Sequence, residues 1–355
     1  MNFDLSDEQK MLAEQARALL SEHSSYERLR QLIDAGAEWD EPLWRRMADL
    51  GFLGAAIPEE FGGLGLSDLD QGVIAAELGR ANAATPFFSS IVLAANAVRA
   101  AGSEAQKSKW LPAIASGDVV ATMSYPGSAI PGVLLKGGKL SGQIAPIADA
   151  GVASVAIVGT NQTLALVELD QPGVTREKLE SFDHLRPHYA LTFDGAKAEL
   201  LDANAAQIAA IYDRAAVQAA FEAVGGAEAC LYMARDYAAE RRIFGRPLSS
   251  YQAIKHKLAD ILLAVEFAKS NAYFAAWAAD DAPDDLPLAA AASRLSASAA
   301  FEQAARENLQ VHGGIGYTFE ANCHFYYRRE RTLALALGGR QAWADRLIAH
   351  VPGLR

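Results

Sequence analysis

The most informative segment of this chain reads Arg241-Arg242-Ile243-Phe244-Gly245-Arg246-Pro247-Leu248, and it interrupts an Ala-rich helical pattern. Taken alone, it predicts the end of a helix, where arginines satisfy carbonyl groups and glycine caps the last turn. Its three arginines stand out in a chain whose net charge is −11. Because a guanidinium can hold two phosphate oxygens at once, the cluster would also suit an anionic cofactor such as a dinucleotide or coenzyme A.

A second segment reads Gln310-Val311-His312-Gly313-Gly314-Ile315-Gly316-Tyr317. It predicts a helix stop followed by a glycine-rich turn. It is not a Rossmann fingerprint, because a helical run and not a strand precedes Gly313.

Together with Gln252, these segments resemble the FAD-binding signature of acyl-CoA dehydrogenases. Three N-terminal stretches also look like this family's first domain: Gly51-Phe52-Leu53-Gly54, Ile57-Pro58-Glu59-Glu60-Phe61-Gly62-Gly63-Leu64-Gly65 and Ala76-Glu77-Leu78-Gly79-Arg80. The resemblance covers most of the chain. It implies that Arg241 reaches across a subunit interface to the FAD pyrophosphate of a neighbouring chain. The cofactor-binding residues that it implies are Arg241, Phe244, Gln252, Gln310, Gly313, Gly314 and Gln341.

The apolar pattern predicts an α+β fold in the order helices, strands, helices, which is also what the resemblance implies. We expect an N-terminal helical domain over residues 1–115, a middle β domain over 116–203 and a C-terminal four-helix-bundle domain over 204–355. Ser6 and Gln9 form a capping-box pattern at the first helix. The predicted strands are Val119–Met123, Val152–Val158, Thr163–Leu169 and Tyr189–Phe193.

Further helices are predicted at Leu43–Leu50, Leu69–Ala81 and Ser90–Ala101. The long helical region from Ala205 to Ile348 is interrupted by an acidic joint at residues 280–287 and by the glycine-rich turn.

The resemblance also implies a reaction, the oxidation of the Cα–Cβ bond of an acyl-CoA thioester. In the family a glutamate removes the α-proton and a hydride leaves for the flavin. Ungapped counting from Gly313 makes the family's preceding arginine Arg328 and puts Leu337 at the glutamate position. Leucine cannot accept a proton, and a positioned base contributes roughly 10²–10⁴-fold in rate.

Some family members carry the base on an earlier helix, and the matching position here is Ala215. Asp213 and Glu222 are the nearby carboxylates that could replace it, but the sequence favours a surface position for each. The catalytic residue therefore stays unknown at this stage.

The β region departs from the family as well. Where the family has Thr-Glu-Pro, this chain has Ser124-Tyr125-Pro126, which retains a hydroxyl. Where the family has Trp-Ile-Thr against the flavin ring, it has Pro146-Ile147-Ala148. The retained residues are those a family member offers to its neighbour's FAD, and the missing ones build a chain's own pocket.

This asymmetry predicts a subunit of a heteromeric acyl-CoA dehydrogenase, similar to bacterial two-component enzymes for bulky steroid-derived thioesters. The partner would carry the catalytic glutamate. Two alternatives stay open: a self-sufficient FAD-dependent dehydrogenase with a relocated base, and a non-catalytic scaffold or binding homo-oligomer. The resemblance also implies an electron-accepting flavoprotein partner, whereas the identity of the acyl group cannot be read from the sequence.

Charge and cysteine usage exclude several other classes. The acidic balance argues against nucleic acid as a partner. Cys230 and Cys323 lack metal-ligand spacing, so we expect neither a metal site nor a disulfide framework. Neither a signal peptide nor a membrane-spanning run is visible, and we expect a cytoplasmic location.

Overall fold

The computed structural model describes residues 5–125, 132–161, 163–351 and 353. The chain forms two compact units. One comprises Met1–Glu27, Gly72–Ala83 and Ala216–Arg355, and the other comprises Arg28–Gln71 and Ala84–Ala215. Each unit groups segments that contact one another, although these segments are far apart in the sequence. The three consecutive domains expected from the sequence stay a prediction.

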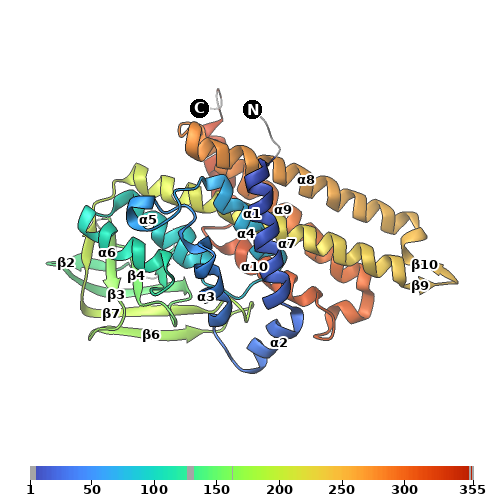
Figure 1. The fold of residues 1–355 in the computed structure, drawn as a ribbon, viewed down its shortest axis with the longest axis horizontal. Helices are drawn as coiled ribbons and strands as arrows, with labels where there is room; N and C mark the ends of the chain where they lie inside the picture. The colour runs from blue at the N-terminus through green and yellow to red at the C-terminus, as the bar shows by residue number, and fades with distance from the viewer. Residues whose placement is uncertain (1–4, 126–131, 162, 352, 354–355) are drawn as a thin grey trace. The chain divides into compact units, whose positions relative to one another are not determined.

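The first unit is helical, and long helices form most of it (Figure 1). Its elements are α1 (Asp7–His23), the end of α4 (Asp68–Arg80), most of α7 (Ala205–Glu240), β9 (Arg242–Ile243), β10 (Arg246–Pro247), η4 (Leu248–Ser250), α8 (Gln252–Asp281), α9 (Leu286–His312), η5 (Gly313–Tyr317), α10 (Cys323–Leu335) and α11 (Arg340–His350). The acidic joint between α8 and α9 lies where the sequence predicts it. Alanines such as Ala272 and Ala297 are fully buried, so α8 and α9 can pack closely.

Two glycines let α4 and α7 cross with their backbones in contact. A Cβ on Gly79 would lie 2.0 Å from the Glu222 carbonyl oxygen, and one on Gly225 would lie 1.8 Å from the Ala76 carbonyl oxygen. Real Cβ atoms do not approach so closely, so any side chain at either position would force the two helices apart. The crossing also fixes the place of Glu222 on α7.

The second unit combines short helices with two four-stranded sheets. Its helical elements are α2 (Tyr26–Asp34), α3 (Glu41–Asp49), η1 (Phe52–Gly54), η2 (Glu59–Phe61), η3 (Phe88–Ala95), α5 (Asn96–Ala101) and α6 (Glu104–Ala115). Its strands are β1 (Ala121–Met123), β2 (Leu134–Lys136), β3 (Lys139–Ala148), β4 (Val155–Gly159), β5 (Leu164–Glu168), β6 (Val174–Leu179), β7 (His188–Lys197) and β8 (Glu199–Leu201). The sheet orders are β1-β4-β5-β8 and β2-β3-β7-β6.

The α+β class is confirmed, and the four predicted strands correspond to β1, β4, β5 and β7. The sequence analysis did not predict β2, β3, β6 and β8, nor the two-residue strands β9 and β10. In β6 all six residues are at least partly exposed, so the apolar alternation that marks a half-buried strand is weak there. The capping box is confirmed: the Gln9 amide donates to the Ser6 hydroxyl at 3.2 Å, and the Ser6 amide donates to the Gln9 side chain at 3.0 Å.

Candidate functional site

The arginine-rich segment forms a tight hairpin directly after α7. The Arg241 amide donates to the Tyr237 carbonyl at 2.8 Å, and the Leu248 amide donates to the Arg241 carbonyl at 2.7 Å. Phe244 and Gly245 connect β9 to β10 with φ angles of 48° and 81°. A two-residue turn with both residues in the left-handed region matches the twist of a hairpin, and glycine adopts it without strain.

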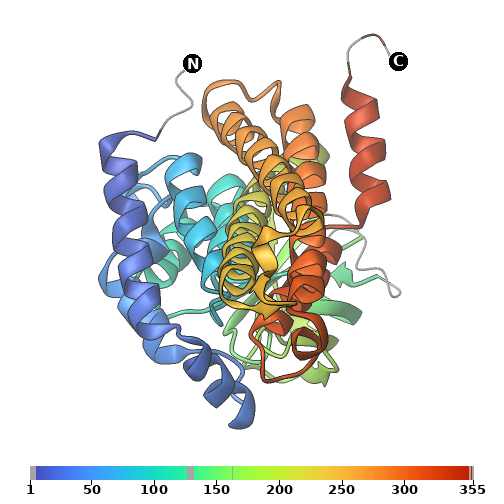
Figure 2. The ribbon, with the colours of Figure 1, turned by 90° about the vertical axis from the view of Figure 1, so that its right-hand side faces the viewer.

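Packing brings the hairpin and the glycine-rich turn to one end of the helical unit. Ala234 and Ala238 of α7 are buried against Val311 of α9, and Leu248 and Ile254 pack on this cluster. Figure 2 looks onto this end, with the hairpin toward the viewer. Arg241, Phe244, Gln252, Gln310, Gly313 and Gly314 therefore share one end of the unit. We call this set the bundle edge.

An aromatic pair ties α7 to α9 at the bundle edge, and the sequence analysis did not select it. The rings of Tyr237 and His312 stack with their centroids 4.1 Å apart. The Tyr237 hydroxyl donates to the His312 carbonyl at 3.4 Å. Burial lowers the pKa of His312, so the ring is neutral near pH 7. Tyr237 lies one helical turn before Arg241, and that spacing is the signal that could have identified it.

The bundle edge presents cationic and apolar groups outward. Among the described residues, Arg241 and Arg242 have no ion pair, and the Arg246 guanidinium lies 3.8 Å from the centre of the Tyr251 ring. The Phe244 side chain is 96% exposed. Exposed guanidinium groups suit a diphosphate, and an exposed ring suits the apolar parts of a large cofactor.

Open space above the backbone completes this surface. A Cβ on Gly245, Gly313 or Gly314 would meet no atom within 4 Å. A flat molecule could therefore approach these backbone segments closely. The described residues of the bundle edge fit a dinucleotide such as FAD in charge, apolar surface and access.

Gln341 is the one predicted cofactor residue that lies elsewhere. It is exposed near the start of α11, where its amide donates to Asp345 at 2.8 Å. Arg294 fixes the segment just before α11 by donating to the carbonyl oxygens of Leu333 and Ala336. Because Arg294 precedes Gln310 on α9 by sixteen residues, roughly 24 Å of helix separates that anchor from the bundle edge.

The position predicted for the base is a buried apolar site. Leu337 is 2% exposed with φ of 63°, and the Trp343 indole donates to its carbonyl at 3.1 Å. Ala215, the alternative position, is fully buried. Neither side chain can take up a proton.

The two carboxylates considered as replacements are buried and not on the surface. Asp213 is 1% exposed and Glu222 is 5% exposed. The Arg329 guanidinium donates to Glu222 at 3.1 Å, and it also donates to the Ala83 carbonyl. Glu222 is thus the ion-pair partner of the buried Arg329, and it does not lie on the surface.

Arg328 and Arg329 differ in their surroundings. The Arg328 guanidinium lies 5.1 Å from the centre of the Phe319 ring, whereas Arg329 is 1% exposed and pairs with Glu222. Counting residues along the sequence could not show which of these two arginines is buried, because burial depends on which face of α10 meets α7.

In the sheet unit, the residues compared with the family's flavin contacts serve the fold. The Ser124 hydroxyl accepts from the Gly159 amide at 3.0 Å, and the Tyr212 hydroxyl donates to the Ser124 carbonyl at 2.9 Å. Ser124 and Ile147 are buried. Pro126 lies outside the described residues. Within residues 146–148, no aromatic ring is present to stack on a flavin.

The described residues contain neither a metal-ligand cluster nor a membrane-spanning helix. No group of three or more His, Cys, Asp or Glu side chains is placed to hold a metal ion. Among the helices that the structure describes, none is long and apolar enough to cross a membrane.

Comparison with known proteins points to one family. The family model for the acyl-CoA dehydrogenase N-terminal domain matches residues 6–118, and the model for the C-terminal domain matches residues 206–351. The chain is 30% identical over 348 residues to acyl-CoA dehydrogenase IpdE2 of Mycobacterium tuberculosis, with 97% of this chain and 98% of that protein covered.

Two solved structures are similar along almost their whole length. The ChsE4–ChsE5 complex from Mycobacterium tuberculosis has a TM-score of 0.91 and 27% identity, covering 99% of this chain and 100% of that one. The Tcur3481–Tcur3483 steroid acyl-CoA dehydrogenase, in a G363A variant, has a TM-score of 0.90 and 29% identity, with 97% of each chain covered.

Proposed function

Because this chain belongs to the acyl-CoA dehydrogenase family of FAD-dependent oxidoreductases, we propose that it completes the FAD site of a homologous partner subunit that carries the catalytic glutamate. The proposed reaction is the α,β-dehydrogenation of an acyl-CoA thioester. When bound, FAD supplies the acceptor for the hydride. This chain would supply binding groups and no base.

The observation that carries the proposal is the contrast between the bundle edge and the base positions. At the bundle edge, Arg241 has no ion pair within the described chain, and the backbone at Gly313 and Gly314 is open. At the base positions, Leu337 and Ala215 are buried and apolar. A chain that only contributes to its neighbour's site needs the cofactor-binding residues of the bundle edge. It does not need a proton-accepting side chain at the base positions.

The proposed roles follow from the chemistry of each group. Arg241 would hold the pyrophosphate with its fork of donors, and the Phe244 ring would cover an apolar part of the cofactor. Gln252 and Gln310 would donate amide hydrogen bonds. Gly313 and Gly314 would leave room for the adenine end, while Gln341 would act from its separate position near α11.

The relatives support a heteromer and a bulky acyl group. One similar structure is a complex of two differently named chains, and the other is a steroid acyl-CoA dehydrogenase with a two-part name. We therefore propose a steroid-derived or similarly bulky acyl-CoA as substrate. A separate electron-accepting flavoprotein would reoxidise the cofactor, and the assembly would work in the cytoplasm.

Native mass spectrometry tests the proposal, because it reports the oligomer and the bound FAD together. The chain should be measured alone and after co-expression with a glutamate-bearing homologue. We expect no FAD on the chain alone and one FAD for each pair of unlike chains. One FAD per chain in a homo-oligomer would contradict the proposal and favour a self-sufficient enzyme. An absence of FAD from every assembly would favour the scaffold alternative.

A further inference from the structure

We propose that a pocket between α1, the end of α4 and α10 binds a small organic monocarboxylate. This inference is independent of the proposed function, because the pocket uses none of the residues of the bundle edge. The pocket has a volume of about 320 Å³ and lies wholly within the helical unit. That size falls at the lower end of the range for small-molecule sites.

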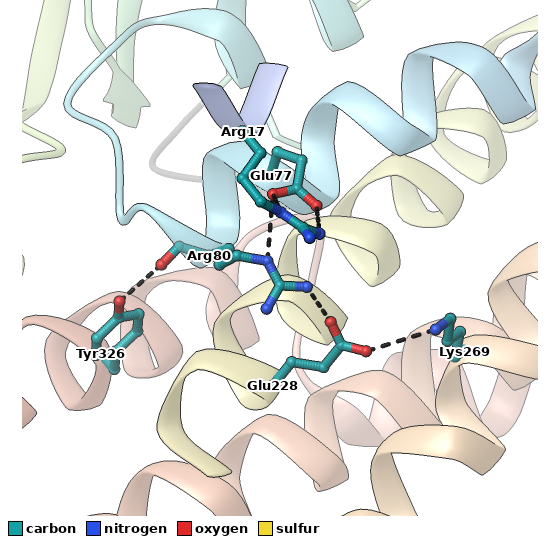
Figure 3. A network of polar contacts seen from close by, with 6 residues as sticks. All are labelled: Arg17, Glu77, Arg80, Glu228, Lys269 and Tyr326. Atoms are coloured by element: carbon teal, nitrogen blue, oxygen red, sulfur yellow. Dashed lines mark hydrogen bonds and ion pairs between the residues drawn. The ribbon is translucent and has the colours of Figure 1, made fainter. Parts of the chain in front are cut away.

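Five charged groups form one network (Figure 3), and three of them, Arg17, Glu77 and Arg80, line the pocket. Arg17 holds both oxygens of Glu77, at 3.0 and 2.7 Å, and Arg80 donates to the same carboxylate at 3.2 Å. Arg80 also pairs with Glu228, which lies 3.6 Å from the Lys269 ammonium. Three cations thus share two carboxylates, so the network carries one positive charge in excess.

Two nitrogen atoms of this network have no partner among the described residues. Arg17 uses its Nε and Nη2 atoms, and Arg80 uses the same two atoms, which leaves each Nη1 without a hydrogen-bond partner. Both arginines line the pocket. A carboxylate accepts charge-assisted hydrogen bonds from guanidinium donors such as these two.

The rest of the lining selects a short apolar body with a single charge. Leu20, the Tyr26 ring and Ala81 supply apolar walls. The Tyr26 and Tyr326 hydroxyls lie 2.8 Å apart, and Tyr326 donates to the Arg80 carbonyl at 2.7 Å, so that wall is held in place. The Glu27 carboxylate also lines the pocket, and it would repel a second negative charge.

Calorimetric titration of the full-length protein with benzoate tests the proposal. Benzamide has the same shape without the charge, and inorganic phosphate tests a more highly charged anion. We expect saturable binding of benzoate, about tenfold weaker binding of benzamide, and no stronger binding of phosphate. A bromine peak from 4-bromobenzoate in a crystal should lie between Arg17 and Arg80.

Two matched variants connect the binding to the pocket. Arg17→Gln should weaken benzoate binding about tenfold. Arg45→Gln removes a similarly exposed, ion-paired arginine of the other unit and should leave binding unchanged. The proposal is overturned by an absence of saturable binding, by unchanged affinity in Arg17→Gln, by tighter binding of phosphate than of benzoate, or by bromine located elsewhere.

Discussion

At the scale of single residues, Glu222 separates the alternatives for the missing base. It pairs with Arg329 in the interior, where α4 and α7 cross through glycine. The Arg329 guanidinium donates to its carboxylate at 3.1 Å, and both side chains are buried. The geometry therefore favours a structural role for Glu222.

Glu222→Gln should destabilise the protein by roughly 3–5 kcal/mol, because it removes the carboxylate that pairs with the buried Arg329 guanidinium. Urea unfolding measures this loss. Glu302→Gln is the control, since Glu302 pairs with the half-exposed Arg331 and should cost less than about 1 kcal/mol. A stable Glu222→Gln protein whose dehydrogenation rate falls roughly 10²–10⁴-fold would instead identify Glu222 as the base.

A second buried carboxylate should make stability depend on pH. Glu330 is 2% exposed and lies 2.9 Å from Arg331, and burial raises its pKa to about 7. In the unfolded chain the pKa returns to its ordinary value of 4.5. Between these values the folded state holds a proton that the unfolded state has lost. The stabilising contribution is therefore full below pH 4.5 and is lost as the pH rises through about 7.

Glu330→Gln should remove this dependence. Relative to the unmodified protein, the variant should gain about 3 kcal/mol of unfolding free energy between pH 4.5 and about pH 8. Urea titrations at a series of pH values provide the measurement. A difference between the two proteins that stays constant with pH would show that Glu330 does not titrate in this window.

At the scale of elements, the two adjacent glycines after α9 have different requirements. Gly313 has φ of 65° and ψ of −141°, a conformation that favours glycine, whereas Gly314 is not in the left-handed region. A Cβ at either position would meet no atom of this chain within 4 Å. Folding therefore explains the glycine at 313 and leaves the one at 314 unexplained, unless another molecule approaches it.

Gly313→Ala should cost roughly 1–3 kcal/mol in unfolding free energy through backbone strain. Gly314→Ala should change stability by less than about 0.5 kcal/mol, yet it should reduce the FAD retained by the assembled subunits, because the methyl group occupies the space above the turn. Denaturant titration and flavin absorbance measure the two effects. Unchanged FAD content in Gly314→Ala would mean that this turn does not contact the cofactor.

Elements also differ in how readily the sequence predicts them. The helix start at Ser6 follows from local hydrogen bonds of Ser6 and Gln9, so it could be predicted without any tertiary information. Strand β6 could not, because it pairs with β7 while all of its residues stay at least partly exposed. The Glu222–Arg329 pair joins residues 107 positions apart, and no local pattern predicts it.

At the scale of the whole molecule, positive charge is concentrated in one segment of an acidic chain. The chain carries a net charge of −11, yet Arg241, Arg242 and Arg246 gather on one short hairpin. The sequence indicated this cluster, and packing of α7, α8 and α9 places it beside the glycine-rich turn. What the sequence could not indicate is that Arg241 has no ion pair within the described chain, since that depends on every neighbouring side chain.

This isolation leads to a prediction about the assembled enzyme. Arg241→Gln should leave the unfolding free energy of the chain within about 0.5 kcal/mol, because the side chain has no ion pair to lose. In the pair of subunits it should weaken FAD binding about 10–100-fold, the value of losing one or two charged hydrogen bonds. Arg241→Lys keeps the positive charge but loses the planar set of guanidinium donors. Its FAD affinity should lie between those of the unmodified protein and Arg241→Gln.

Arg235→Gln is the matched control, because Arg235 is exposed near the end of the same helix and pairs with Asp236. It should change neither stability nor FAD binding. Flavin fluorescence of the co-purified subunits gives the affinities, and urea unfolding of the chain gives the stabilities. Equal FAD affinity in Arg241→Gln and Arg235→Gln would mean that the hairpin does not reach a cofactor. Weaker FAD binding with unchanged stability would mean that Arg241 acts on a molecule outside its own chain.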